Sequence, residues 1–130
     1  MAGNPTDLRY SEEHQWVRPD GKFVTLGITQ DRADRLGAIG FAELPYPGEL
    51  FRTGMLFGRL SGENGSAALH MPFVGHINAV NQKLSEAPGV INSDPYGAGW
   101  IVRVEFGDIA EVESLMDAAA YEEFVAAQEG

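Results

Sequence analysis

Few residues of this chain could do chemistry by themselves. Three histidines, His14, His70 and His76, are its candidate metal ligands or proton carriers, and the chain has no cysteine. A structural zinc site needs three or four converging ligands, and the spacing of these histidines matches no zinc motif. We therefore predict no metal site and assign the three histidines structural or surface roles.

The sequence also lacks the patterns that mark an enzyme. It contains no ordered set of nucleophile, base and acid, no phosphate-binding glycine loop and no pair of carboxylates spaced for catalysis. Its only side-chain primary amines belong to Lys22 and Lys83. Lys22 follows a tight turn and Lys83 lies in a loop, so we interpret both as solvated surface residues. A non-catalytic protein is the simpler interpretation, and we assign no catalytic residue.

Length and charge narrow the class further. The 130 residues fit one domain, 1–130, with residues 1–7 as a flexible N-terminal segment. A formal net charge of −10 argues against nucleic acid as a partner, because binding to phosphates needs basic residues. The sequence has neither a membrane-spanning apolar run nor a signal peptide. We expect a cytoplasmic monomer.

Alternating apolar and polar residues dominate and predict a mainly β fold. Strands are expected over residues 16–18, 23–28, 39–44, 56–60, 69–80 and 100–106. Asp20-Gly21 is predicted to form the hairpin turn between the first two strands.

Helices are expected at the periphery of this sheet structure. Thr29 is a candidate N-cap of a short helix that Gly37 ends. Near the C-terminus the apolar period becomes helical, with Asp108 as the cap of one helix and Asp117 as the cap of the last. The whole pattern predicts a small barrel-like sandwich of short strands with peripheral helices.

Six separated segments then resemble one known family. The most specific are residues 57–75, the opening His14-Gln15-Trp16 and the tail motif Asp94-Pro95-Tyr96-Gly97-Ala98-Gly99-Trp100, and segments 26–29, 41–48 and 80–92 follow in the same order and spacing. From about residue 8 to residue 126 the chain resembles the glycine cleavage system H protein family. The resemblance implies a lipoyl-domain-like barrel-sandwich hybrid, mainly β, with short flanking helices and a helical C-terminus.

The chain departs from this family at the positions that carry its chemistry. In the family a lysine at the tip of a hairpin bears lipoate in amide linkage, and the matching residue here is Asn64. A carboxamide has no nucleophilic amine and cannot accept that acyl group. Three nearby acidic positions of the family are neutral here, namely Gln15, Ser61 and Ala68. The resemblance therefore implies a carrier scaffold without its arm, and we predict that lipoate and other cofactors are absent.

Two features have both a structural and a functional interpretation. Asn64-Gly65 is a favoured pair for a two-residue hairpin turn, so the tip can be a simple turn. Alternatively, the tip is a polar knob that binds a ligand or a partner, formed by Glu63, Asn64, Gly65 and Ser66. The acidic residues near the C-terminus form either a solvated helical face or a docking surface for a basic partner; they are Asp108, Glu111, Glu113, Asp117, Glu122 and Glu123.

Three functions follow from these observations. The preferred hypothesis is a non-lipoylated H-like protein that binds other proteins, as a scaffold or a regulator of enzymes of the glycine cleavage type or of another pathway. The second is that the vacated cleft became a small-molecule or catalytic site lined by His14, Gln15, Ser61, Asn64 and His70. The third is an ordinary H protein of glycine catabolism. A clear pocket near these residues favours the second hypothesis, and a cleft filled by Met71 or Phe73 opposes it.

Overall fold

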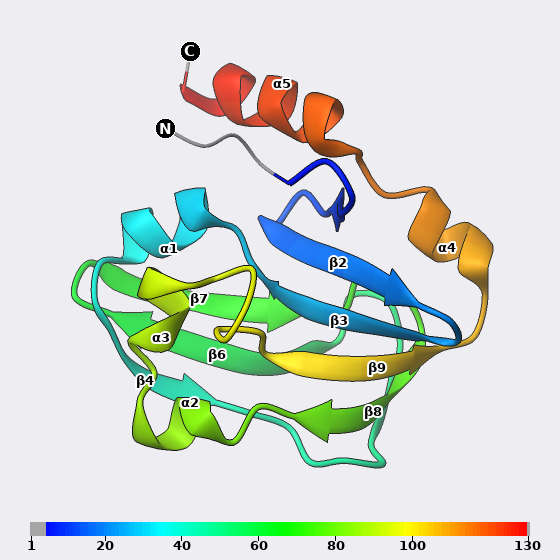
Figure 1. Cartoon of the computed structure of the whole chain (residues 1–130), viewed down its shortest axis with the longest axis horizontal. Coiled ribbons are helices and arrows are strands. Elements are labelled where there is room, and N and C mark those ends of the chain that lie inside the picture. The colour runs from blue at the N-terminus through cyan, green and yellow to red at the C-terminus, as the bar shows by residue number, and fades with distance from the viewer. Residues whose placement is uncertain (1–4, 130) are drawn as a thin grey trace.

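The computed structural model describes residues 5–129 as two antiparallel sheets with helices around them (Figure 1). The larger sheet has the order β1 (Arg9–Tyr10), β2 (Gln15–Asp20), β3 (Phe23–Ile28), β9 (Val102–Phe106), β8 (Gly75–Val80) and β5 (Leu50–Phe51). The smaller sheet has the order β4 (Ile39–Glu43), β6 (Leu56–Gly62) and β7 (Gly65–His70). The mainly β fold expected from the alternation is confirmed.

The segment predicted to be flexible, residues 1–7, is covered only in part. Positions 1–4 lie outside the described residues. From Pro5 onward the chain is described, Leu8 is buried, and the Tyr10 hydroxyl donates a hydrogen bond to the carbonyl oxygen of Pro5. The described end of the segment is therefore attached to the body of the protein.

Both two-residue hairpins differ from the prediction by one position. Asp20 pairs with Phe23, so Gly21 and Lys22 form the first turn and the expected Asp20-Gly21 turn is wrong. Gly21 has φ 63°, which a primed hairpin turn requires at its first central position. Gly62 pairs with Gly65, so the second turn consists of Glu63 and Asn64.

The expected Asn64-Gly65 turn is therefore also wrong. Asn64 does not adopt a positive φ, and the glycine after the turn has φ 143° instead. Both central residues of the turn have ordinary φ, and the positive φ of the next residue explains why glycine follows Asn64. The apex of the hairpin is the peptide between Glu63 and Asn64.

The single strand expected over residues 69–80 is in fact two strands in different sheets. β7 ends at His70 and β8 begins at Gly75. Between them Pro72 lacks the N–H that a continuous ladder needs, and the apolar residues Met71 and Phe73 point into the core instead. The chain crosses from one sheet to the other at this proline.

Five helices are described: α1 (Gln30–Leu36), α2 (Lys83–Glu86), α3 (Val90–Ser93), α4 (Ile109–Glu113) and α5 (Ala118–Glu129). The predicted caps are confirmed: the Thr29 hydroxyl accepts from the amide of Arg32, Asp108 from that of Ala110, and Asp117 from that of Ala120. None of the described helices has the length and apolarity needed to cross a membrane.

Two apolar clusters stabilise the arrangement. The main cluster fills the space between the sheets, and Met71 and Phe73 belong to it with 1% and 0% of their surface exposed. The second cluster lies between β1, β2 and α5 and comprises Leu8, Tyr10, Trp16, Ala118 and Tyr121. Tyr10 and Tyr121 stack with ring centroids 4.8 Å apart, which fixes α5 across the first strands (Figure 1).

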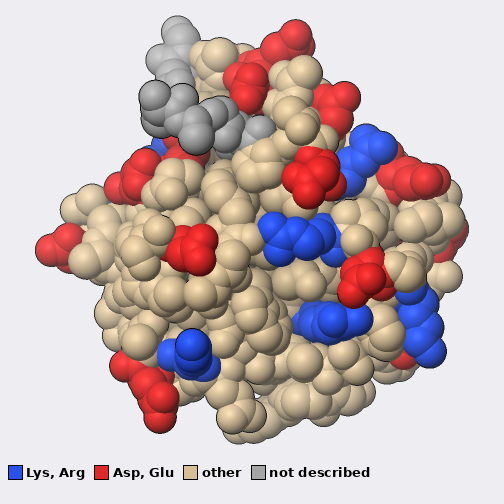
Figure 2. All heavy atoms as spheres, viewed as in Figure 1, with Lys and Arg blue, Asp and Glu red and all other residues tan. Residues whose placement is uncertain are grey.

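Charge is unevenly distributed over the face seen in Figure 2. Acidic side chains lie over α5 and around the margins, and most of the basic side chains lie over the part formed by β2, β3 and β9. Arg18 of β2 and Arg103 of β9 stack on the rings of Trp16 and Phe23, with 4.7 and 4.6 Å from the guanidinium carbon to the ring centroid. Their cations are therefore engaged with the sheet rather than free to form a patch.

Candidate functional site

The tip of the β6–β7 hairpin is attached to the C-terminal end of α1, beside which it lies in Figure 1. Four hydrogen bonds make this attachment: the Asn64 amide to Leu36 O at 2.9 Å, Asn64 Nδ2 to Arg35 O at 3.2 Å, the Glu63 amide to Ala38 O at 3.1 Å, and the Ala38 amide to Glu63 Oε1 at 3.0 Å. The two bonds from Asn64 satisfy carbonyl groups that α1 leaves without intrahelical partners at its end, and the two bonds of Glu63 hold Ala38, which follows the helix. The Asn64 side chain is thus part of a helix cap.

Gly62 makes this close approach possible. A Cβ atom at this position would collide with the carbonyl oxygen of Leu36. The helix end and the hairpin are therefore in direct backbone contact, and no side chain separates them. The Asn-Gly pair indicates a turn, but nothing in the sequence pattern identifies the helix as its partner.

Neither lysine of the chain lies at this tip. Lys83 is the first residue of α2 and is exposed. Lys22 does occupy a hairpin apex, but it belongs to the β2–β3 turn. Its side chain is 71% exposed, and its Nζ lies 3.9 Å from Glu105 and 5.4 Å from the Phe23 ring centroid. Both lysines are surface residues, as the sequence predicts, but Lys83 begins a helix and does not lie in a loop, and Lys22 lies within the turn and not after it.

Gln15 joins the two sheets. It is buried in β2, and its Nε2 donates to the carbonyl oxygen of His70 at 3.0 Å. An ionised glutamate at this position could only accept and would face that carbonyl with a negative charge. The other side-chain polar atom, Oε1, is buried without a hydrogen-bond partner among the described residues. The His70 ring in turn lies 3.0 Å from both carboxylate oxygens of Glu13.

The residues predicted for the cleft and the hairpin fall into four groups. Ser61, Ala68 and His70 lie on the half-buried outer face of the hairpin, opposite the buried Ala67 and Leu69. Glu63, Asn64 and Gly65 lie at the tip against α1. Gln15 bridges the sheets, and His14 faces α5. The fold brings the first two groups onto one hairpin and separates His14 from both.

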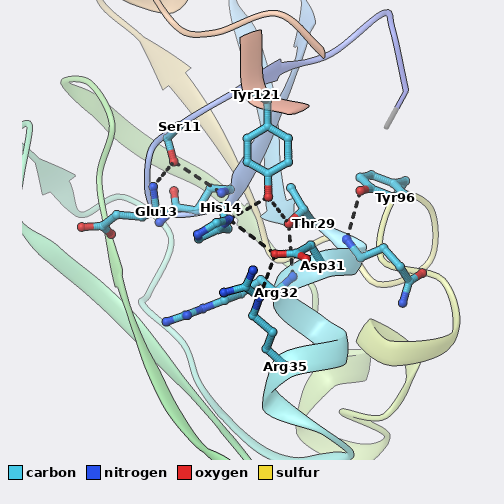
Figure 3. A network of polar contacts seen from close by, with 11 residues as sticks. Ser11, Glu13, His14, Thr29, Asp31, Arg32, Arg35, Tyr96 and Tyr121 are labelled. Carbon is cyan, nitrogen blue, oxygen red and sulfur yellow. Dashed lines mark hydrogen bonds and ion pairs between the residues drawn. The ribbon is translucent and has the colours of Figure 1, made fainter. Parts of the chain in front are cut away.

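His14 belongs to a buried polar network (Figure 3). It adopts φ 65°, and its Nδ1 lies 2.7 Å from the Tyr121 hydroxyl, which lies 2.7 Å from the hydroxyl of Thr29. Because Thr29 already accepts from the Arg32 amide, a consistent proton order runs from Thr29 to Tyr121 to His14 Nδ1. In that order His14 is neutral, with its proton on Nε2. This network fastens α5 to α1 and to the loop before β2.

Burial sets the protonation of this network. It lowers the pKa of His14 below its ordinary value, and the carboxylate of Asp31 offsets this only in part. Burial also raises the pKa of Tyr121 to about 12 and raises the pKa of Tyr10. Near neutral pH all three groups are uncharged, which suits an apolar interface rather than proton transfer.

The charges beside the network come from α1. Asp31 Oδ2 lies 3.9 Å from His14 Nδ1 and 3.0 Å from Arg35 Nε, the latter an ion pair without hydrogen-bond alignment. The half-buried Arg32 side chain extends away from Asp31 toward the green strands of the hairpin (Figure 3). These residues did not stand out in the sequence because charged side chains on a short helix usually face solvent.

Two surface hollows have none of the predicted cleft residues in their lining, although the second borders Ser11, whose hydroxyl accepts from the Gln15 amide. One, of about 300 Å³, is bordered by Leu50, Val74, His76, Glu105 and Phe106; the other, of about 310 Å³, is bordered by Tyr10, Ser11, Glu12, Pro72 and Met116. Met71 and Phe73 are packed in the core. Among the side chains described, those of residues 5–128, no three histidines or carboxylates are placed to hold a metal ion. These observations weigh against the vacated cleft as a ligand site.

Known proteins of one family match this chain over nearly its whole length. Residues 8–128 match the family described as Glycine cleavage H-protein. The glycine cleavage system H protein of Myxococcus xanthus is 43% identical over 93% of this chain and 95% of its own length. The mitochondrial glycine cleavage system H protein 2 of Arabidopsis thaliana is 40% identical over 91% of this chain and 76% of its own length.

The fold agrees with that comparison. The crystal structure of a glycine cleavage system H protein from Mycobacterium marinum superposes with a TM-score of 0.82 at 33% identity, covering 91% of this chain and 95% of the other. This confirms the predicted lipoyl-domain-like architecture. By name, these relatives agree with the third hypothesis, an H protein, better than with the preferred one.

Proposed function

The chain belongs to the glycine cleavage H-protein family, and we propose that it acts within that family as a non-lipoylated binding module rather than as a carrier of a tethered group. Its expected partners are enzymes of the glycine cleavage type in the cytoplasm, which it would bind as a scaffold, a competitor or a regulator. No catalytic residue is assigned to it.

The observation that carries this proposal is the chemistry at position 64. Attachment of lipoate needs a free amine at the hairpin apex, and here the apex presents a carboxamide whose nitrogen donates to Arg35 O. An amide nitrogen is not nucleophilic, because its lone pair is delocalised into the carbonyl. The side chain is also directed to the helix end rather than extended toward a partner.

Gln15 supports the same proposal from a second position. The resemblance places here a glutamate that helps to hold a cationic cargo. Gln15 instead donates to the His70 carbonyl and closes the sheets on each other. Its neutral amide and the neutral Ser61 and Ala68 lack three negative charges that the resemblance places near the cargo, and the nearby carboxylates of Glu13 and Glu63 are engaged with His70 and the Ala38 amide.

A second candidate function is favoured by the relatives themselves. At 40% and 43% identity over nine-tenths of the chain, they carry the name of the glycine cleavage H protein. For this chain to act as a conventional carrier, Lys22 or Lys83 would have to accept the lipoyl group. Lys22 is the better placed, because it lies at a hairpin apex and is exposed.

Mass spectrometry after co-expression with a lipoate-attaching enzyme separates the two candidates. The native chain should show its unmodified mass, while a carrier H protein expressed beside it becomes lipoylated. A lipoyl adduct on the native chain that disappears in the Lys22→Arg variant would establish the carrier function through Lys22. The Lys83→Arg variant is the matched control.

The binding role needs its own assay. Added in excess to a reconstituted glycine cleavage reaction, the unmodified chain should slow turnover, because it occupies docking sites without delivering an arm. Glu63→Lys, which inverts the charge at the tip, should inhibit less than Lys22→Glu, which inverts the charge at the other apex. No inhibition by the native chain would remove the glycine cleavage enzymes from its partners.

A further inference from the structure

We propose that the Asn64-Gly65 peptide of this protein deamidates spontaneously through a cyclic imide, and that the product releases the hairpin tip from α1. This inference concerns the chemistry of the tip alone. It holds whichever function the protein performs.

The residue that follows Asn64 is the first reason to expect deamidation at this position. The chain has five asparagines, and only Asn64 is followed by glycine. Cyclisation needs the backbone nitrogen of the next residue to reach the side-chain carbonyl carbon, and a glycine places no Cβ in the way. Both residues are exposed, and no atom lies within 4 Å of the place where a Cβ of Gly65 would stand.

Two other asparagines are held more firmly by their side chains. Asn81 is buried, and its Nδ2 donates to Ala98 O at 2.8 Å and to Trp100 O at 2.7 Å. Asn92 donates to Gly37 O at 2.8 Å and accepts from the Ile39 amide at 2.9 Å. The Asn64 side chain is exposed and donates to Arg35 O at the longer distance of 3.2 Å. The structure thus leaves Asn64 freer to reach the reactive rotamer.

The reaction balances without an external oxidant or reductant. The Gly65 nitrogen attacks Cγ of Asn64, a new N–Cγ bond forms, and the side-chain nitrogen leaves as ammonia with the proton of the Gly65 amide. Water then adds to one of the two imide carbonyl carbons and opens the ring. The product is aspartate if the backbone nitrogen is released from the side-chain carbonyl, or isoaspartate if it is released from the backbone carbonyl.

The fold controls how fast this happens. Gly65 pairs with Gly62 at the closed end of the hairpin, so its nitrogen can turn toward Cγ of Asn64 only when the tip opens. The Glu63 carboxylate helps to keep the tip closed through its bond to the Ala38 amide. Deamidation should therefore follow local opening of the tip and not global unfolding.

The product undoes the cap that favoured the closed tip. Aspartate at position 64 cannot donate to Arg35 O, and its negative charge lies next to the carbonyl groups at the negative end of α1 and beside Glu63. Isoaspartate also adds one carbon to the backbone, so the Gly62–Gly65 pair and the bond from residue 64 to Leu36 O cannot both be kept. Either product loosens the tip.

Peptide mapping of the native chain during incubation at mildly alkaline pH tests the reaction. We expect aspartate and isoaspartate to accumulate at position 64 while Asn81 and Asn92 stay intact in the same sample. In the Asn64→Gln variant this site should remain unmodified. In Glu63→Ala the reaction at Asn64 should be severalfold faster. An unmodified Asn64, or equal modification of Asn81 and Asn92, would overturn the proposal.

Hydrogen exchange of an Asn64→Asp variant tests the structural consequence separately. The amides of residues 38, 63 and 64 should exchange severalfold faster than in the native chain, with β2 and β9 unchanged. Exchange at the tip equal to that of the native chain would show that the product does not release it. A lowered melting temperature with faster exchange everywhere would equally contradict a local release.

Discussion

Each of the two hairpin apices of this protein lacks a feature that the other apex has. The β2–β3 apex holds an exposed lysine, Lys22, whose amine lies 3.9 Å from Glu105 at the sheet surface. The β6–β7 apex carries Asn64 and is bound by two hydrogen bonds to the last residues of α1 and by two more to Ala38 just after the helix. One apex has the amine without the helix-anchored scaffold, and the other has the scaffold without the amine.

In this protein the reactive amine and the turn that is anchored to a helix are found at two different apices. A carrier needs an apex that is rigid and also bears a nucleophilic amine, and this chain distributes the two properties over different turns. The Asn64 side chain has become part of the support, since it caps the helix that holds the tip. This use of position 64 is consistent with a protein that acts through binding.

The largest effect is expected from restoring the carrier residues at the anchored apex. A variant combining Asn64→Lys with Ser61→Glu and Ala68→Asp should become lipoylated on co-expression with the attaching enzyme, because it supplies the amine on an existing scaffold. Intact mass measures the change from none to substantial modification. Attachment of lipoate to Lys22 instead would show that the β2–β3 apex, and not the β6–β7 apex, is the one that the attaching enzyme recognises.

Among single substitutions, Gln15→Glu should destabilise the protein more than a change at either apex. It removes the donor to His70 O and buries a carboxylate, with an expected cost of about 1–3 kcal/mol by denaturant unfolding near pH 7. Gln15→Met is the control that loses the bond without gaining charge.

The pH dependence of the free energy of unfolding shows whether the lost hydrogen bond or the buried charge destabilises the Gln15→Glu variant. Burial raises the pKa of the new carboxyl, so the variant should approach the Gln15→Met control as the pH falls toward the ordinary glutamate value of about 4.3. A cost independent of pH would mean that the lost bond and not the charge is responsible.

The native protein should lose stability as the pH falls from about 7 toward 5, through the ordinary histidine range. His14 has a lowered pKa in the folded state, so the unfolded chain binds the proton first and is favoured as the pH drops. Chemical unfolding of the native chain and of His14→Gln as a function of pH checks this. The variant should have the flatter profile, and equal slopes would assign the effect to other groups.

The smallest effect is expected at the tip itself. Asn64→Ala removes one exposed hydrogen bond, so the unfolding free energy should fall by about 0.5–1 kcal/mol, and amide exchange should rise mainly at residues 38, 63 and 64. Lys22→Ala at the other apex should change neither quantity. An equal response at both apices would mean that the attachment to α1 adds nothing.

Local signals in the sequence predicted the fold well because they depend on neighbouring residues. The caps at Thr29, Asp108 and Asp117 and the strand alternation were all found in the structure. Both hairpin turns were misplaced by one residue, because an X-Gly pair does not say which of its members closes the turn.

The site depended on contacts that a sequence pattern does not encode. Gln15 and His70 are 55 positions apart, and His14 and Tyr121 are 107 apart. Asn64 stood out only as a departure from a resemblance, and its role as a cap required the position of α1. No pattern in the sequence indicates that the Tyr121 hydroxyl joins His14 to Thr29.

Neither lysine of this protein is expected to accept lipoate, and the proposed binding role depends on that absence. Intact-mass analysis of the native chain, produced with an active lipoate-attaching enzyme and lipoate in excess, tests it most directly. We predict a single species of the unmodified mass beside a fully lipoylated carrier H protein from the same cells. A species heavier by one lipoyl group, mapped to Lys22 or Lys83, would contradict the non-lipoylated function.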